Sequence, residues 1–264
     1  MSKRVTISTL NKMKAEREKF VMITAYDATF ARLVSDAGAE TILVGDSLGM
    51  VLQGHDTTIP VSLQDMVYHT ACVCRARPHS LVVADLPFMS YDTPETALAS
   101  GKQLMQAGAQ MVKLEGGVWL SDTIHQLVER GIPVCAHLGL MPQSVNVYGG
   151  YRVQGRTPKE AKSILADAVE IQDAGASILL LECVPAHLAA DISSKLDIPV
   201  IGIGAGPGTD AQVLVLHDML GLTEKPAKFV QNFMQNASSV QEALAAFVTA
   251  VKTGSYPQEE HTYS

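Results

Sequence analysis

The sequence is poor in charged residues, in cysteine pairs and in long apolar runs, and each shortage excludes a class of protein. Charged residues make up 18% of the 264 residues and hydrophobic residues 47%, a balance that supports a large core and argues against disorder. No window of about 18 uninterrupted apolar residues exists, so no membrane-spanning helix is expected. The formal net charge is −7 and no basic stripe stands out, so nucleic acid is not an expected partner.

The N-terminus and the cysteines together predict a cytoplasmic protein. The first 20 residues lack the apolar core of a signal peptide, so export is not expected. The chain has four cysteines, and none forms a CxxC pair; Cys72 and Cys74 make only a CxC. We therefore expect four reduced thiols, with a soft-metal site as the alternative.

Eight short runs of aliphatic and β-branched residues predict a parallel sheet. The runs are almost continuously apolar, which is typical of parallel strands covered on both faces. Each is followed by a stretch with helical character, and alternation of this kind favours βαβ units. The predicted strands are residues 21–25, 41–45, 80–84, 111–115, 133–137, 178–182, 199–203 and 213–217.

Helix boundary signals support the same alternation. Ser62 is expected to cap a helix over 62–75, and Thr93 before Pro94 is expected to cap another. Ala-Gly pairs at 37–38, 107–108 and 174–175 read as helix ends that lead into the next strand.

Eight repeats over this length favour a closed TIM (β/α)₈ barrel over an open doubly wound sheet. No linker divides the chain, so a single domain over 1–264 is expected. An extra helix starting near Thr9, a C-terminal helix over about 237–252 and a polar tail over 253–264 complete the prediction.

Charged side chains follow the predicted strands at the end where such barrels build their active sites. Asp46, Asp85 and Glu115 follow three adjacent strands, so their carboxylates are expected to converge at one rim. Oxygen ligands suit a hard cation such as Mg²⁺. The alternative is that each acid only caps the helix that follows it.

Lys113 lies two residues before Glu115, so both side chains share one face of the fourth strand. A buried lysine there needs an anion, either a substrate carboxylate or enolate or a neighbouring acid in an internal salt bridge. A Schiff-base lysine conflicts with the adjacent carboxylates, which would keep the amine protonated.

Glu182 follows the apolar run ILLL, and burial there should raise its pKa toward the range of a general base. The alternative is a helix-capping glutamate. His137 ends the predicted fifth strand and is expected to contact substrate or order the metal shell, or else to be a purely structural histidine.

Two long loops follow strands 2 and 5, at 47–60 and 138–157. The second has about 20 residues, a length typical of functional loops, and Gly149, Gly150 and Gly155 would permit motion. Asn146, Tyr148 and Tyr151 offer stacking and hydrogen bonds to a flat ligand. The glycine-rich 202–206 stretch suggests a phosphate site only weakly, because close packing at a barrel corner explains it equally well.

Several long motifs resemble the ketopantoate hydroxymethyltransferase family. The resemblance is collinear from about residue 5 to Glu259, Glu260 and His261, and only the stretch 221–226 looks shorter and less glycine-rich than expected. The motifs lie at residues 44–50, 53–58, 84–89, 112–117, 137–144, 149–151 and 181–185.

This resemblance implies transfer of a hydroxymethyl group from 5,10-methylenetetrahydrofolate to 3-methyl-2-oxobutanoate, which yields 2-dehydropantoate for pantothenate synthesis. It also implies a barrel of the phosphoenolpyruvate-binding superfamily and a homo-oligomer, commonly a decamer. By the same resemblance Asp46, Asp85 and Glu115 match Mg²⁺ ligands. Asp46, Ser47, Asp85 and Lys113 match oxo-acid contacts, and Glu182 matches the proton acceptor.

Two other functions remain open on the residues alone. A Mg²⁺-dependent lyase or mutase of the same barrel superfamily would share the metal site but would need no folate. A non-catalytic barrel could bind a metabolite through the same rim, although the charged set described above argues against it.

Overall fold

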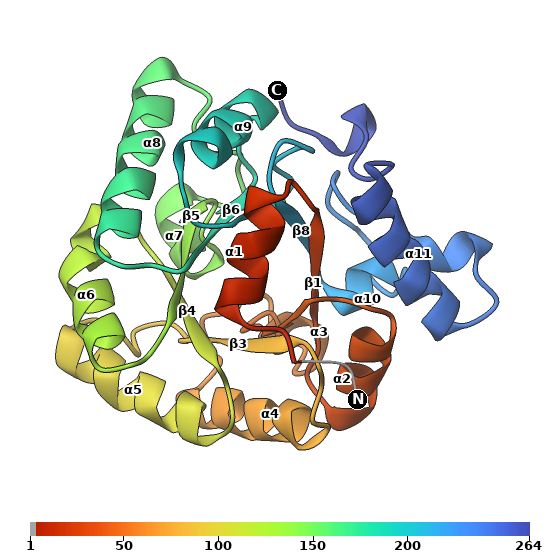
Figure 1. Cartoon of the computed structure of the whole chain (residues 1–264), viewed down its shortest axis with the longest axis horizontal. Helices are drawn as coiled ribbons and strands as arrows, with labels where there is room; N and C mark the ends of the chain where they lie inside the picture. The colour runs from red at the N-terminus through yellow and green to blue at the C-terminus, as the bar shows by residue number, and fades with distance from the viewer. Residues whose placement is uncertain (1–3) are drawn as a thin grey trace.

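The computed structural model describes residues 4–264 and shows a closed barrel of eight parallel strands (Figure 1). Each strand pairs with its neighbours in chain order, and β8 pairs with β1 to close the ring. This confirms the predicted barrel. The strands are β1 (Phe20–Thr24), β2 (Thr41–Val44), β3 (Leu81–Asp85), β4 (Met111–Glu115), β5 (Val134–Gly139), β6 (Ile178–Glu182), β7 (Val200–Ile203) and β8 (Ala211–Leu214).

The predicted strand positions hold to within two residues, except for the last. The strand expected over 213–217 runs over Ala211–Leu214 instead. Its apolar character continues to Leu216, but there the backbone N–H bonds the Thr24 hydroxyl oxygen at 2.9 Å and the chain turns into the short helix α10 (Leu216–Met219). β5 also continues two residues beyond His137.

Helices form the outer ring of the barrel (Figure 1). One follows each strand except β7, because residues 204–210 cross directly to β8 without a helix. A Cβ on Gly206 or Gly208 would lie 2.5 or 2.6 Å from Ala186 or Ala190 of α9, so this connection packs tightly on that helix. The ring helices are α2 (Ala28–Asp36), α4 (Leu63–Arg75), α5 (Pro94–Gln106), α6 (Ser121–Glu129), α8 (Pro158–Asp173), α9 (Ala186–Lys195) and α11 (Val240–Thr253).

The predicted helix boundaries are confirmed by their local chemistry. Ser62 and Thr93 each accept a hydrogen bond from the backbone three residues on, within a capping box. Gly38, Gly108 and Gly175 follow helix ends with φ of +91°, +112° and +105°. Only glycine adopts such angles without strain, so these residues set where each helix stops.

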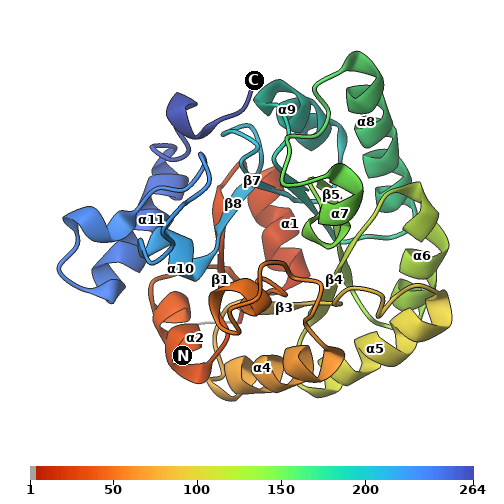
Figure 2. The same ribbon diagram turned by 180° about the vertical axis from the view of Figure 1, so that it is seen from behind.

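The extra N-terminal helix, α1 (Ile7–Ala15), covers the end of the barrel where the strands begin, as Figure 1 shows. It starts two residues before the predicted position because Thr6 caps it. Lys14 Nζ ties it to the barrel through Asp210 Oδ2 at 2.7 Å. The opposite end, seen in Figure 2, carries the short helices α3 (Leu48–Val51), α7 (Val145–Tyr148) and α10. Because these helices are short, that end of the barrel leaves room for a site.

The last residues do not form the polar tail that we expected. Tyr256 is 3% exposed and packs edge-on against Phe233 and Phe247, with ring centroids 5.7 and 5.6 Å away. His261 is also buried, within the short 3₁₀ turn Glu259–His261. The prediction was wrong because it followed the mostly polar composition of the segment, whereas one aromatic residue, Tyr256, anchors it.

The described residues, 4–264, bear on the expectations about a membrane-spanning helix and about the cysteines. No helix among them is both long and apolar enough to cross a membrane. All four cysteines are free, and Cys135 and Cys183 are buried.

Candidate active site

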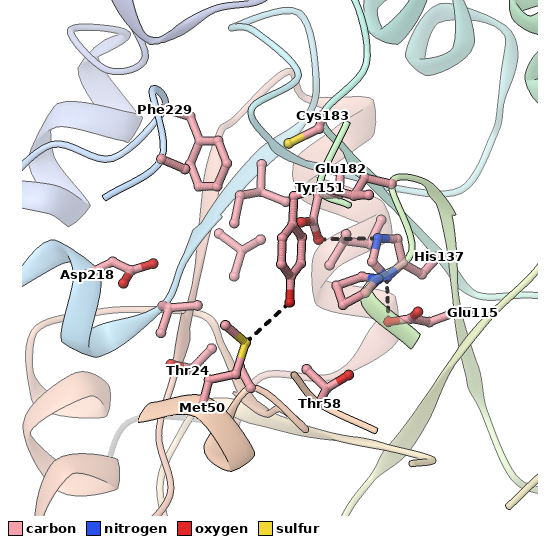
Figure 3. A pocket seen from close by; sticks show the side chains of 18 of the residues that line it. Thr24, Met50, Thr58, Glu115, His137, Tyr151, Glu182, Cys183, Asp218 and Phe229 are labelled. Carbon is pink, nitrogen blue, oxygen red and sulfur yellow. Dashed lines mark hydrogen bonds and ion pairs between the residues drawn. The ribbon is translucent and has the colours of Figure 1, made fainter. Parts of the chain in front are cut away.

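A cavity of about 860 Å³ opens at the carboxyl ends of the strands. The strand ends form its floor, and charged, apolar and aromatic side chains line it, among them Tyr151 and Phe229 (Figure 3). All seven residues predicted for the site line it: Asp46, Ser47, Asp85, Lys113, Glu115, His137 and Glu182. The barrel thus brings together side chains spread over 137 positions of sequence, counted from 46 to 182.

Lys113 lies on the cavity floor between two carboxylates. Its ammonium Nζ lies 2.7 Å from Asp85 Oδ1 and 3.7 Å from Glu115 Oε1, and its side chain is almost fully buried. Burial alone would lower the pKa of Lys113, but Asp85, Glu115 and Asp46 outweigh it and raise that pKa. The amine therefore stays protonated, which supports a charge-pairing role and argues against a Schiff base.

Asp46 and Asp85 lie side by side. Asp85 Oδ2 accepts a hydrogen bond from the backbone N–H of Asp46 at 3.0 Å, while Asp46 Oδ2 accepts one from the Gln143 amide at 2.8 Å. Burial, followed by repulsion from Asp85 and Glu115, raises the pKa of Asp46 well above its ordinary value. Ionisation of Asp46 is therefore disfavoured within this pair.

Glu115 is held differently from the two aspartates. Its Oε2 accepts a hydrogen bond from the Gln143 backbone N–H at 3.1 Å, and its Oε1 lies 3.3 Å from His137 Nδ1. Burial opposes ionisation, but contacts with His137 and Lys113 lower the pKa of Glu115 below its ordinary value. This carboxylate is therefore engaged by protein groups on both oxygens.

The three acids share the cavity without forming a three-ligand metal cluster. Among residues 4–264, no group of three or more histidine, cysteine, aspartate or glutamate side chains is arranged to hold a metal ion. The convergence that we predicted is therefore confirmed only as a shared cavity. The donor set still suits Mg²⁺, which commonly takes one or two carboxylates and completes its shell with water and substrate oxygens.

Glu182 lies at the end of β6, on the far side of His137 from Glu115 (Figure 3). Its side chain is 16% exposed, and its Oε2 lies 3.5 Å from His137 Nε2. Burial, with a further contribution from Glu115, raises the pKa of Glu182 to about 8. The predicted pKa shift is therefore present, and a carboxyl with this pKa can gain or lose a proton near neutrality.

His137 stands between Glu115 and Glu182, and dashed lines mark both contacts in Figure 3. Neither ring nitrogen has a partner in hydrogen-bond geometry, although both are buried. Burial lowers the pKa of His137, although Glu115 and Asp85 act in the opposite direction. The ring is therefore a neutral bridge that lies in the site itself, which favours the functional interpretation over the structural one.

The rim of the cavity combines a loop that carries Tyr151 with cationic side chains. Tyr151 is half-exposed and its hydroxyl donates to Met50 Sδ at 3.6 Å, across the mouth. Arg152, Arg156 and Lys225 also line the cavity. Of the three residues proposed for a flat ligand, Tyr151 is in the lining, whereas Asn146 and Tyr148 are not.

Comparison with known sequences decides the family. A sequence profile described as ketopantoate hydroxymethyltransferase matches residues 4–259. The chain belongs to this family. A protein of Pseudomonas entomophila (strain L48) named 3-methyl-2-oxobutanoate hydroxymethyltransferase 2 is 60% identical over 262 residues, 98% of each chain. One of the same name from Hahella chejuensis (strain KCTC 2396) is 58% identical over 98% of this chain and 99% of its own.

Solved structures agree on the fold of this hydroxymethyltransferase. Phosphonopyruvate hydrolase aligns with a TM-score of 0.63 at 13% identity and covers 83% of this chain and 84% of its own. A 2,3-dimethylmalate lyase, described as a member of the PEP mutase/isocitrate lyase superfamily, aligns with a TM-score of 0.57 at 18% identity, over 81% and 79%. At these identities the likeness concerns the barrel alone.

The sequence patterns did not predict the uncharged side chains that hydrogen-bond to the site residues of the hydroxymethyltransferase. Gln143 donates to both Asp46 Oδ2 and the Leu86 carbonyl, and its own Oε1 accepts from the Tyr91 hydroxyl at 2.6 Å. Ser47, predicted as a substrate contact, shares a 2.9 Å hydrogen bond with the Tyr26 hydroxyl. Gln143 lies within the family motif at 137–144, which was the only signal that could have found it.

The glycine-rich stretch after β7 is explained by packing. Gly204 and Gly206 have φ of +59° and +75°, and a Cβ on either would lie within 2.7 Å of Phe229 or Ala186. A side chain at either position would therefore push apart the wall of the cavity. This favours the packing interpretation of 202–206 over a phosphate site.

Proposed function

We propose that this hydroxymethyltransferase joins a one-carbon unit from 5,10-methylenetetrahydrofolate to C3 of 3-methyl-2-oxobutanoate with the help of Mg²⁺. The product would be 2-dehydropantoate, which serves pantothenate synthesis. The observation that carries this proposal is the division of the cavity floor into two parts. Asp46, Asp85 and Lys113 form a charged cluster on one side, and Glu182 forms a separate, protonatable carboxyl on the other.

Asp46 and Asp85 are the residues that would hold Mg²⁺, with Glu115 beside them in the position that the family resemblance assigns to a third ligand. When bound, the cation supplies Lewis acidity that stabilises negative charge developing on the keto oxygen. The support is electrostatic: three buried carboxylates lie around the buried ammonium of Lys113, so acids outnumber the lysine there. A divalent cation would offset that imbalance.

Lys113 and Glu182 perform the proton chemistry that the reaction requires. Glu182 takes the proton from C3, while the ammonium of Lys113 stabilises the enolate more than the neutral ketone. The raised pKa makes Glu182 a stronger base than an ordinary carboxylate and lets it gain and release a proton near neutral pH. His137 contacts Glu182 at 3.5 Å and would orient its carboxylate toward the substrate.

The size and lining of the cavity support a second, larger substrate. About 860 Å³ lies within the range of pockets that bind drug-sized ligands, far above the need of a five-carbon oxo acid. Phe229, Ile203 and Tyr151 offer apolar surface for a pterin ring. The cationic rim would complement the carboxylates at the glutamate end of the folate.

We extend the proposal to the setting of the enzyme. Four free thiols support a reducing compartment, in keeping with a cytoplasmic location. The family resemblance supports a homo-oligomer, with a decamer as the form to test. Family membership argues against the lyase, mutase and non-catalytic alternatives considered for the sequence alone.

Proton exchange tests the base and the metal together. NMR of 3-methyl-2-oxobutanoate in D₂O should show loss of the C3 proton with enzyme and Mg²⁺ but without folate. Glu182→Gln should abolish this exchange while still binding the oxo acid, because glutamine cannot accept the proton. Exchange at the wild-type rate in Glu182→Gln would show that Glu182 is not the base. Full exchange by the wild type in excess chelator would show that the metal is not required.

Formation of 2-dehydropantoate tests the one-carbon donor. Product should appear only when 5,10-methylenetetrahydrofolate is added, and Asp85→Ala should lose both product formation and its dependence on Mg²⁺. Product formation without folate would contradict the proposed co-substrate and leave the proton-exchange step unaffected.

A further inference from the structure

The C-terminal segment, residues 254–264, reaches the wall of the catalytic cavity. Tyr263 lines that cavity together with Cys183 and Glu182. Its carbonyl oxygen accepts a hydrogen bond from the Ala186 N–H, at the start of α9, with a length of 3.0 Å. Both views place the C-terminus beside α9 (Figures 1 and 2). The last residues are therefore docked onto the element that follows β6 and Glu182.

A second set of contacts holds this segment from the other side. Lys228 Nζ donates to the Thr262 carbonyl and lies 5.5 Å from the centre of the Tyr263 ring. Further back, the buried Tyr256 and His261 anchor the segment to the aromatic cluster beside α11. Tyr263 is thus fixed at both its backbone and its ring.

Three side chains converge where Gly204 leaves room. A Cβ at Gly204 would lie 2.7 Å from Phe229 Cδ1, 3.1 Å from Tyr263 Cε2 and 3.3 Å from Cys183 Sγ. All three side chains therefore crowd around one point on the cavity wall. Figure 3 shows the Cys183 thiol and the Phe229 ring on the same side of the cavity, above Glu182.

Cys183 connects this cluster to Glu182 through the backbone. It has φ of +47°, a left-handed conformation that is unusual for a residue with a side chain. Its N–H bonds the Ile203 carbonyl and its carbonyl accepts from the Gln154 N–H, both at 2.9 Å. Strained residues of this kind persist only where their surroundings hold them, and they gather at functional sites.

We propose that Tyr263 is a positioning residue: it clamps the Cys183 thiol against Gly204, holds Glu182 in its reactive orientation and closes that side of the cavity to water. The inference rests on the proposed role of Glu182 as the base. It also gives a purpose to the C-terminal motif around Glu259, Glu260 and His261, which would deliver Tyr263 to the cavity wall. Without the ring, Cys183 could relax from its left-handed conformation, and the adjoining carboxylate would shift.

The test measures exchange of the C3 proton of 3-methyl-2-oxobutanoate into D₂O with Mg²⁺ and without folate, resolving kcat and KM. Tyr263→Ala should lower the exchange kcat about 10- to 100-fold, as misplacement of a catalytic group by about 1 Å does, with KM changed much less. Tyr263→Phe keeps the ring and should exchange like the wild type. Tyr68→Ala, which removes an exposed tyrosine from α4 outside the cavity, is the matched control.

A double-mutant cycle separates clamping from a general loss of structure. If Tyr263 acts through Cys183, then Cys183→Ala combined with Tyr263→Ala should lose no more kcat than the larger single loss. If the two single losses in kcat multiply in the double variant, the proposal is overturned. It is also overturned if Tyr263→Ala keeps the wild-type kcat. An equal loss in Tyr263→Phe would assign the effect to the hydroxyl and would also overturn it.

Two further outcomes have a defined meaning. Should Tyr263→Ala fail to fold, Tyr263→Leu replaces it, and a wild-type exchange kcat in that variant would refute the clamp. Should the wild type itself exchange no C3 proton, the proposed function fails, which is distinct from a wild type that exchanges normally and is indifferent to Tyr263.

Discussion

At the residue scale, Glu182 illustrates how reactivity opposes stability. The carboxyl is largely buried, next to other acids, and the neighbouring His137 has its own pKa lowered by burial. Its ionised form is therefore disfavoured in the folded state, and the pKa of about 8 records that penalty. A base of this kind is useful because it binds its proton strongly, and the same property weakens the fold when the proton leaves.

This opposition predicts a pH-dependent gain in stability for Glu182→Gln in the presence of chelator. A carboxyl whose pKa rises on folding contributes stability below its ordinary pKa of 4.5 and loses it as the pH rises toward 8. Glutamine stays neutral throughout. The variant should therefore be more stable than the wild type at pH 7–8, by about 1–3 kcal/mol after allowing for partial exposure.

Thermal unfolding followed by circular dichroism across pH 4 to 8 measures this effect. The difference between the two melting temperatures should shrink toward zero near pH 4, where both side chains are neutral. A constant difference over the whole range would show that burial of the Glu182 charge is not its cause.

The charged residues of the site could be predicted from sequence, and their neutral partners could not. Asp46, Asp85 and Lys113 stand out because a charge within or just after an apolar strand needs an explanation. Gln143 carries no charge and comes from a loop, so nothing in its own position marks it. The choice of Glu115 to contact His137 and the Gln143 N–H depends on side-chain rotamers, which sequence patterns do not reveal.

At the element scale, the strand ends are held by backbone geometry as much as by side chains. Gly139 ends β5 with φ of +92°, and a Cβ there would lie 2.2 Å from the Glu182 carbonyl oxygen. The next residue, Leu140, donates its N–H to that same oxygen at 2.8 Å. The end of β5 thus supports the backbone of Glu182.

We predict that Gly139→Ala impairs both the fold and the base. The added methyl group would meet a backbone atom that cannot move without displacing β6, and alanine is strained at this φ. The expected cost is about 2–4 kcal/mol of unfolding free energy, together with loss of C3 proton exchange. Urea unfolding and the NMR exchange assay measure the two effects.

Gly131→Ala provides a matched control. Gly131 has φ of +80°, but a Cβ there would have no heavy atom within 4 Å. This substitution should cost only the conformational strain, about 1 kcal/mol, and leave exchange unchanged. Equal destabilisation by the two variants would show that the contact with Glu182 is unimportant.

Element prediction succeeded where one apolar run made one strand and failed where long-range contacts set the boundary. Helix ends followed from local signals such as Thr93 before Pro94. The end of β8 did not, because the hydroxyl of Thr24, in β1, captures the Leu216 N–H. The missing helix after β7 is likewise a consequence of packing on α9, a distant element in sequence.

At the scale of the whole molecule, closure of the ring concentrates charge that the chain spreads widely. Asp46, Asp85 and Glu115 come from three different βα units, yet burial and mutual repulsion raise the pKa of Asp46. The fold therefore carries an electrostatic cost that a bound cation would remove. The C-terminal segment also depends on distant parts of the chain. Its packing against Phe233 and Phe247 could not be predicted from the sequence of the segment alone.

The final prediction concerns the response of global stability to Mg²⁺ when Asp46 is neutralised. Asp46→Asn keeps an acceptor for Gln143 and leaves the ion pair between Lys113 and Asp85 intact. In chelator the variant should melt above the wild type, because one buried like charge is gone. Saturating Mg²⁺ should reverse this order: at about 100 times its Kd, a ligand stabilises the native state by about 2.7 kcal/mol, and the variant should gain little.

Differential scanning fluorimetry with Mg²⁺ titration measures both effects, and Asp122→Asn on the exposed side of α6 controls for the loss of charge alone. An equal Mg²⁺ response in Asp46→Asn and wild type would place the cation elsewhere, because an ion held by Asp46 must lose affinity when that carboxylate becomes an amide.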